Sequence, residues 1–204
     1  MKSFPAVLLL AVAGLSLPAA VPAQSNADPG AVEAGSYTLD SAHTLAQFSV
    51  VHFGINDFYG TFPGATGTLS IDPKNLATAK LDVSVPVATV STTNKVLDEE
   101  LVSADWFDAA KFPAIRFVST KVTRTGPKTA TIAGNLTLHG VTKPATLDAT
   151  FQAAAVNPMK KVYTIGFKAT GSIRRSDFGV SKYVPMVSDE TVLTITAAFE
   201  KTAG

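Results

Sequence analysis

The chain has 204 residues, contains no cysteine, and balances 17 Lys and Arg residues against 16 Asp and Glu residues. This balance argues against nucleic acid as a partner, because phosphate binding needs a basic excess, and against electrostatic docking on a membrane. The lack of cysteine excludes disulfides and cysteine chemistry, so the hydrophobic core alone must stabilise the fold.

Residues 1–23 have the pattern of a secretory signal peptide. Lys2 precedes an apolar run from Ala6 to Leu17, and small residues ending at Ala23 form a cleavage motif. A membrane anchor is the alternative, but the run is shorter than the ~20 residues that span a bilayer. The sequence therefore predicts an exported protein with no integral membrane span in its mature chain. The periplasm is the expected location, with secretion as the second choice.

The remainder of the chain predicts a leader and one domain. Residues 24–34 are small and polar and contain Pro29-Gly30, a composition typical of a flexible segment. Residues 35–204 are long enough to form a single domain with a sizeable core.

Most of this domain alternates apolar and polar residues with a period of two, which predicts β-strands with one buried face. Turn signals such as Asp72-Pro73 and Asn157-Pro158 separate the strands. The pattern is typical of antiparallel sheet with one solvated face, in either a sandwich or a closed barrel. The expected strands number about nine and centre on residues 36–40, 44–53, 68–72, 80–87, 115–117, 131–138, 146–153, 163–173 and 193–200.

One segment, about residues 93–110, breaks the alternation and predicts a short helical insert. Ser103 is the expected N-cap of its second part, since a serine hydroxyl accepts from free amides at a helix start. Trp106 and Phe107 recur there at helical spacing, and Pro113 ends the helix. We expect this insert to close or flank one mouth of a barrel.

The strand faces that we expect to point inwards combine large aromatic residues with small ones such as Ala149 and Ala169. Small residues on an inner face leave volume unfilled, which favours a barrel with a cavity for one ligand over a packed sandwich. An apolar chain bound there would gain roughly 0.8 kcal/mol per buried methylene. The inward aromatic residues are Phe48, Phe117, Phe151, Phe167 and Phe199.

Two polar residues share the inward phase. His52 follows Phe48 and Val50, so it is either a core histidine bonded to a carbonyl or a tyrosine, or a polar group lining a ligand cavity. An inward Arg175 is costly unless it is paired. A structural pair with Asp177 is one interpretation, and contact with the polar head of a ligand is the other.

Motifs of known catalytic chemistry are absent: the chain has no nucleophile elbow, phosphate-binding loop, dinucleotide fingerprint or paired-histidine metal motif. His43 and His52 would lie on opposite faces of one strand and His139 in a turn, so we expect no metal site. Asp40 and His43 predict a local structural turn. An acid–base enzyme using Asp40, His43 or His52 stays an alternative, provided that these groups converge in one pocket. We therefore assign no catalytic residue, metal or cofactor.

Six short motifs, in this order, resemble the YceI-like family of exported bacterial polyisoprenoid-binding proteins. The resemblance runs from Tyr37 to about Phe199. Residues 97–101 read LDEEL, where many relatives look more like Arg-Asp-x-His-Leu, which argues against a polar ligand contact from that segment. The motifs are YTLDSAHT (Tyr37–Thr44), FSVVHFG (Phe48–Gly54), Gly60–Phe62 with the following Gly64, ADWFDAAKFPAIRF (Ala104–Phe117), GNLTLHGVTKP (Gly134–Pro144) and RRSDFGV (Arg174–Val180).

The resemblance implies an all-β fold, a lipocalin-like eight-stranded antiparallel β-barrel with a long apolar ligand in its tunnel. It also implies isoprenoid quinones or related prenyl lipids as ligands, a periplasmic location, no enzymatic activity and, for some members, a link to stress responses. We accordingly expect a protein that binds, transports or stores an isoprenoid lipid. A structural or interaction barrel with a filled core is the second alternative, and a symmetric homodimer is compatible with the sequence.

The residues expected to line the tunnel follow from strand phase and from these motifs. Tyr37, Leu81 and Phe199 are expected in its wall or in the core. The candidate ligand-binding residues are Phe48, Val50, His52, Phe58, Trp106, Phe107, Phe117, Leu136, Phe151, Phe167, Arg175 and Phe178.

Overall fold

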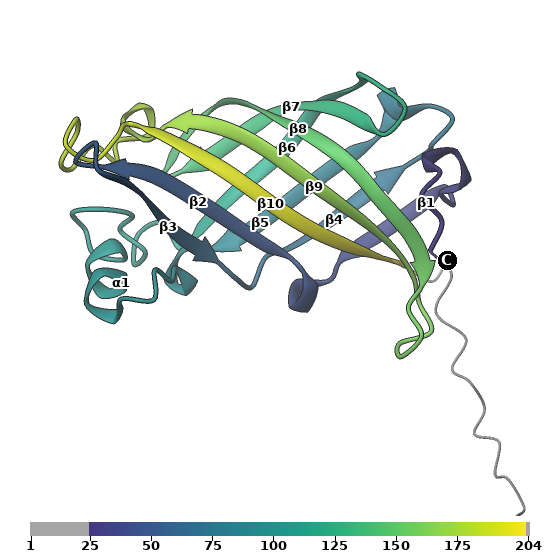
Figure 1. The fold of residues 1–204 in the computed structure, drawn as a ribbon, viewed down its shortest axis with the longest axis horizontal. Helices are drawn as coiled ribbons and strands as arrows, with labels where there is room; N and C mark the ends of the chain where they lie inside the picture. The colour runs from purple at the N-terminus through teal and green to yellow at the C-terminus, as the bar shows by residue number, and fades with distance from the viewer. Residues whose placement is uncertain (1–24, 203–204) are drawn as a thin grey trace, which may run out of the picture.

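A computed structural model describes residues 25–202, so the expected signal peptide lies outside the described residues. Ten antiparallel strands build an elongated barrel with one short α-helix at its side (Figure 1). The strands are β1 (Gly35–Leu39), β2 (Leu45–His52), β3 (Asn56–Phe62), β4 (Thr66–Ile71), β5 (Lys80–Pro86), β6 (Ala114–Arg124), β7 (Thr129–Leu138), β8 (Val141–Val156), β9 (Tyr163–Arg174) and β10 (Glu190–Lys201). The helices are α1 (Lys95–Leu101) and the 3-10 turns η1 (Pro29–Ala31), η2 (Ser41–His43), η3 (Leu76–Thr78), η4 (Val87–Thr89) and η5 (Arg175–Phe178).

Strand β10 closes the barrel. Its last residues pair with β1, with Phe199 opposite Leu39, while its first half pairs with β2, with Ile195 opposite Ala46. The turn η2 between β1 and β2 lets both strands use the same neighbour. The closed cycle is β1-β4-β5-β6-β7-β8-β9-β10, and the β2–β3 hairpin extends from β10. This confirms the expected eight-stranded antiparallel barrel, in which closure removes free sheet edges.

Strand β3 is a tenth strand that the alternation pattern did not predict. It pairs with β2 along its whole length, with Gly60 opposite Phe48 and Asn56 opposite His52. On its other side only Thr61 is bridged, to Ser91 in the segment that contains α1. That segment therefore covers the side of the barrel beside β3, as Figure 1 shows at its lower left.

The helical insert is shorter than expected. Only α1 is helical, with Asn94 as its N-cap, and residues 102–112 form successive turns. Ser103 is not an N-cap; its carbonyl accepts from the amides of Trp106 and Asp108. Asp108 has a positive φ of 48°, which interrupts a right-handed helix at this point.

The segment before β1 also differs from the expectation of a flexible leader. Asn26 pairs with Ala154 on β8, and Val32 is buried in the core beside Tyr37. These contacts fix residues 25–34 against one end of the barrel. Across residues 25–202, no helix is long and apolar enough to cross a membrane.

Candidate functional site

An apolar cavity of about 510 Å³ runs inside the barrel. Inward side chains of the closing strands line it, joined by residues of the β2–β3 hairpin and of the α1 segment. His52 and Tyr183 mark one end, and Lys80, Arg124 and Lys128 lie at the other. The volume falls within the range of small-molecule sites, so the barrel has room for a ligand and is not filled by its own side chains.

The cavity gathers nearly all of the residues predicted from the sequence. The exception is Phe178, which is buried in η5 and packs behind the cavity wall, in the core cluster that contains Leu138 and Leu147. The predicted residues that line the cavity are Phe48, Val50, His52, Phe58, Trp106, Phe107, Phe117, Leu136, Phe151, Phe167 and Arg175. Leu81 and Phe199 line it as well, whereas Tyr37 is fully buried in the core.

Aromatic contacts shape one stretch of the tunnel wall. The Phe167 ring lies 5.6 Å from the Phe151 ring and 6.2 Å from the Phe199 ring, both edge to face. Ala149 and Ala169 pair on adjacent strands and line the cavity beside them. Because alanine is small, this position keeps the middle of the tunnel open.

Trp106 and Phe107 line the tunnel from the α1 segment. The indole Nε1 of Trp106 donates to Glu100 Oε1 at 2.9 Å, which orients the ring. The Arg175 guanidinium stacks over the same ring at 5.6 Å. Phe107 packs edge to face against Phe62 on β3, so the segment contributes wall as well as cover.

Arg175 is buried, with 6% of its surface exposed, but it does not pair with Asp177. Asp177 lies near Lys143 instead, at 3.3 Å. The guanidinium donates to four backbone carbonyls of one loop, at 2.8–2.9 Å: those of Val180, Lys182, Val187 and Ser188. Burial lowers the pKa of Arg175 from its ordinary value, and the nearby Asp189 opposes that shift. Arg175 therefore holds the loop of residues 180–188 in place at the tunnel end.

His52 lies at the same end of the tunnel. Its backbone bridges Val187, and its ring packs edge to face on Phe53, with 4.3 Å between the ring centroids. Within residues 25–202, the imidazole makes no hydrogen bond to a protein group. The expectation of a core histidine bonded to a carbonyl or tyrosine is therefore not met.

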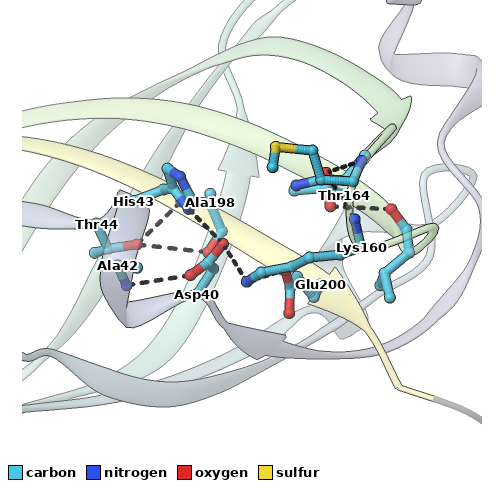
Figure 2. Close-up of polar contacts among 11 residues, drawn as sticks. Asp40, Ala42, His43, Thr44, Lys160, Thr164, Ala198 and Glu200 are labelled. Carbon is cyan, nitrogen blue, oxygen red and sulfur yellow. Dashed lines mark hydrogen bonds and ion pairs between the residues drawn. The ribbon is translucent and has the colours of Figure 1, made fainter. Parts of the chain in front are cut away.

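Asp40 and His43 form a polar cluster at the turn between β1 and β2 (Figure 2). Asp40 caps η2 by accepting from the Ala42 amide, and its Oδ2 lies 2.7 Å from His43 Nδ1 and 3.1 Å from Lys160 Nζ. Lys160 also reaches Glu200 on β10 at 2.7 Å. The pair is thus a structural turn tied to the β8–β9 loop, as the sequence indicated.

The cluster holds the pKa of Asp40 at about 2. Burial alone would raise this pKa and is the largest single influence, but hydrogen bonds from His43, Lys160 and Ala42 together outweigh it. Neither Asp40 nor His43 lines the cavity. His52 lies at the far end of β2, roughly 25 Å away at ~3.3 Å per residue, so these groups do not converge in one pocket.

Further polar residues line the cavity and were not predicted, among them Thr191, Lys80, Arg124 and Lys128. Thr191 has the same inward phase as Leu193 and Ile195, and extending that strand by two residues would have identified it. The three basic residues lie at strand ends or in a turn, where alternation no longer defines a direction.

Comparison with known proteins places this barrel in a family. The model of the YceI-like domain matches residues 37–199. The chain belongs to the YceI-like family. A UPF0312 protein of Pseudomonas fluorescens is 40% identical over 157 residues, covering 74% of this YceI-like chain and 79% of the relative. A UPF0312 protein of Pseudomonas savastanoi is 37% identical over 153 residues, with the same shares covered.

Solved structures share the YceI-like barrel. The YCEI protein of Campylobacter jejuni is 30% identical, with a TM-score of 0.66 over 74% of this chain and 90% of that one. BcnA of Burkholderia cenocepacia has the same fold at 24% identity, with a TM-score of 0.69 over 78% and 98% of the two chains. A polyisoprenoid-binding domain of Saccharophagus degradans shares the fold at 12% identity, with a TM-score of 0.62 over 83% and 100%.

Proposed function

We propose that this protein binds an apolar isoprenoid lipid inside its barrel, without catalysis, and so carries or stores it. The observation that carries the proposal is the cavity of about 510 Å³, lined almost throughout by aliphatic and aromatic side chains. Each methylene that enters such a site gains roughly 0.8 kcal/mol. A long prenyl chain would therefore bind tightly without any charged anchor.

The relatives support the same class of ligand. The domain from Saccharophagus degradans is described as polyisoprenoid-binding, and it shares this barrel. Family membership over residues 37–199 includes every strand that lines the cavity. We extend the ligand class to this chain because its own cavity is apolar and elongated.

The distribution of titratable groups supports binding over catalysis. Asp40 bonds to His43 and to Lys160 away from the cavity, so neither Asp40 nor His43 can act as an acid or base beside His52. General acid–base chemistry needs positioned groups within hydrogen-bond reach of one reacting centre. Glu100, which also lines the tunnel, accepts from Trp106 and Lys182, so its carboxylate is held by structural contacts.

The finer parts of the proposal concern location and ligand subclass. The secretory pattern of residues 1–23 supports action in the periplasm, where a lipid with a long prenyl tail needs a carrier through water. Isoprenoid quinones are the favoured subclass, because their tails suit the apolar wall and their rings suit the aromatic end around Trp106. A role in stress responses belongs to the same proposal.

The proposal is tested by blocking the middle of the tunnel. Ala169→Phe places a ring beside Phe167 and Phe151, where the bore depends on a small side chain. We expect affinity for a fluorescent prenyl probe to fall by at least about tenfold, equivalent to ~1.4 kcal/mol. Thr170→Phe, on the exposed face of the same strand, is the control and should bind as the unmodified protein does.

Two results would contradict the proposal. One is an unmodified protein that takes up no prenyl probe. The other is an Ala169→Phe variant that is folded and binds as tightly as the Thr170→Phe control. Circular dichroism and the unfolding midpoint of each variant show whether the barrel is intact.

A further inference from the structure

Thr191 carries a hydroxyl group that nothing in the described chain satisfies. Its side chain is buried, with 7% of its surface exposed, and it lines the tunnel. Its Oγ1 is the one fully buried side-chain oxygen or nitrogen in residues 25–202 that has no hydrogen-bond partner. Buried polar groups in folded proteins nearly always have a partner, so this exception requires an explanation.

The surroundings of Thr191 are apolar on both neighbouring strands. Thr191 pairs with Ile173 on β9. On β2, Val192 pairs with Ser49, so the same register places Thr191 opposite Val50. The next inward residue on β2 is His52, whose ring also makes no hydrogen bond to the described chain. One buried hydroxyl without a partner and one half-buried imidazole thus lie at the same end of the tunnel, among mostly apolar side chains.

A purely structural role does not account for this threonine. The other inward residues of β10 are apolar, namely Leu193, Ile195, Ala197 and Phe199. Valine has nearly the same shape as threonine, suits a β-strand equally well and would avoid the cost of a buried, unpaired hydroxyl. The position is therefore better explained by a partner that arrives with the ligand.

The cations near this end of the tunnel restrict the kind of partner. Arg175 directs its donors to four backbone carbonyls. Lys182 lies at 3.2 Å from both Glu100 and Asp105. A phosphate group would need free cationic donors, and these two cations are already engaged. One hydroxyl and one imidazole suit a single uncharged oxygen instead.

We propose that Thr191 and His52 form the subsite for an uncharged oxygen, carbonyl or hydroxyl, at the end of the bound lipid. The inference rests on the proposed function, because it assigns an orientation to a lipid in the tunnel. The oxygen-bearing end lies beside Thr191, and the chain extends past Ala169 towards Phe167 and Phe199. The subsite selects lipids by their end group, while the apolar wall supplies most of the affinity.

The test compares Thr191→Val with Thr194→Val, which makes the same change on the exposed face of β10. The probes are geranylgeraniol, the aldehyde geranylgeranial, geranylgeranyl phosphate and the hydrocarbon in which a hydrogen atom replaces the hydroxyl group of geranylgeraniol. We expect Thr191→Val to weaken binding of the alcohol and the aldehyde by about tenfold and to leave the hydrocarbon unchanged. His52→Leu should weaken the same two probes, and Thr194→Val should change none.

Stability measurements separate a ligand role from a structural one. Because the hydroxyl has no partner within residues 25–202, Thr191→Val should melt at the same temperature as the unmodified protein or higher. A lower melting temperature, or equal loss for alcohol and hydrocarbon, would overturn the subsite. The subsite would also be overturned if the protein bound the phosphate more tightly than the alcohol and Thr191→Val did not change this preference. Failure of the unmodified protein to bind even the hydrocarbon would instead overturn the proposed function.

Discussion

The ring of Phe48 on β2 lies directly over Gly60, its cross-strand partner on β3. A Cβ atom at position 60 would overlap the ring edge, so only glycine lets the ring lie flat against the neighbouring strand. Phe48 then packs against Phe62 at 5.5 Å between ring centroids and leaves the tunnel open. The Phe117 ring on β6 likewise lies over a glycine, Gly134 on β7, although its direct cross-strand partner is Leu136.

Gly60→Ala should therefore lower stability and narrow the tunnel. The methyl group forces the Phe48 ring off its position, and overpacking of this kind costs about 1–3 kcal/mol. Urea unfolding measures the loss, and prenyl-probe binding should weaken in parallel. Gly166→Ala is the control, since a Cβ there meets nothing closer than 3.7 Å. Equal stability of the two variants would contradict the role assigned to Gly60.

Arg175→Met should destabilise the tunnel end. The substitution leaves four backbone carbonyls without their donor, so we expect a loss of at least about 3 kcal/mol in the free energy of unfolding. Arg175→Lys should lose a similar amount of stability, because one ammonium group cannot reach all four carbonyl acceptors. Arg174→Met removes an exposed neighbour and should cost less than about 1 kcal/mol. If Arg175→Met lost less than about 1 kcal/mol of unfolding free energy, the loop of residues 180–188 would not depend on Arg175.

Acid should weaken the cluster around Asp40. Its pKa of about 2 in the folded protein lies below the ordinary value of 3.8, so its contribution is full above roughly pH 4 and is lost as the pH falls towards 2. The shift corresponds to about 2 kcal/mol at ~1.4 kcal/mol per unit. Asp40→Asn should lose this stability at neutral pH, and its deficit should shrink on acidification.

The control for this pH dependence is Asp57→Asn, which changes an exposed carboxylate on β3. Its stability should follow that of the unmodified protein between about pH 6 and pH 2. Thermal unfolding at several pH values provides the measurement. A deficit of Asp40→Asn that stays constant across this range would contradict the assigned pKa shift.

Trp106 should report on the bound ligand, because it is the only tryptophan and it lines the tunnel. A quinone ring accepts an electron from an excited indole, so ubiquinone should quench the emission on binding. The hydrocarbon squalene should bind without such quenching. Trp106→Phe abolishes the signal and serves as the control. Binding of ubiquinone without any quenching would place the quinone ring away from Trp106.

Strand alternation predicted most of this fold because each barrel strand has one apolar face. The phase assigned to Thr44, Phe48 and His52 agrees with the side of β2 that faces the cavity. Strand β3 was missed, since asparagine, aspartate and glycine weaken its β pattern and pairing with β2 holds it. The sequence predicts a helical insert over about residues 93–110, but its second part forms turns, because local spacing does not reveal the positive φ at Asp108.

The site was predictable where it depends on strand phase and not where it depends on loops. Alternation pointed Arg175 inwards, but its partners are backbone carbonyls, which have no signature in the sequence. Phe178 lies in the same motif and was expected to line the tunnel, but η5 directs its side chain into a core cluster. Thr191 follows the inward phase, but only the structure shows that its hydroxyl has no partner.

The most direct test of the account is native mass spectrometry of the mature protein purified from its own host, followed by solvent extraction and identification of the lipid. We predict one bound molecule per chain with a prenyl tail and an uncharged oxygen at its end, such as an isoprenoid quinone. The Ala169→Phe variant, purified in the same way, should carry none. A protein that is free of lipid and takes up no added isoprenoid would contradict the central claim.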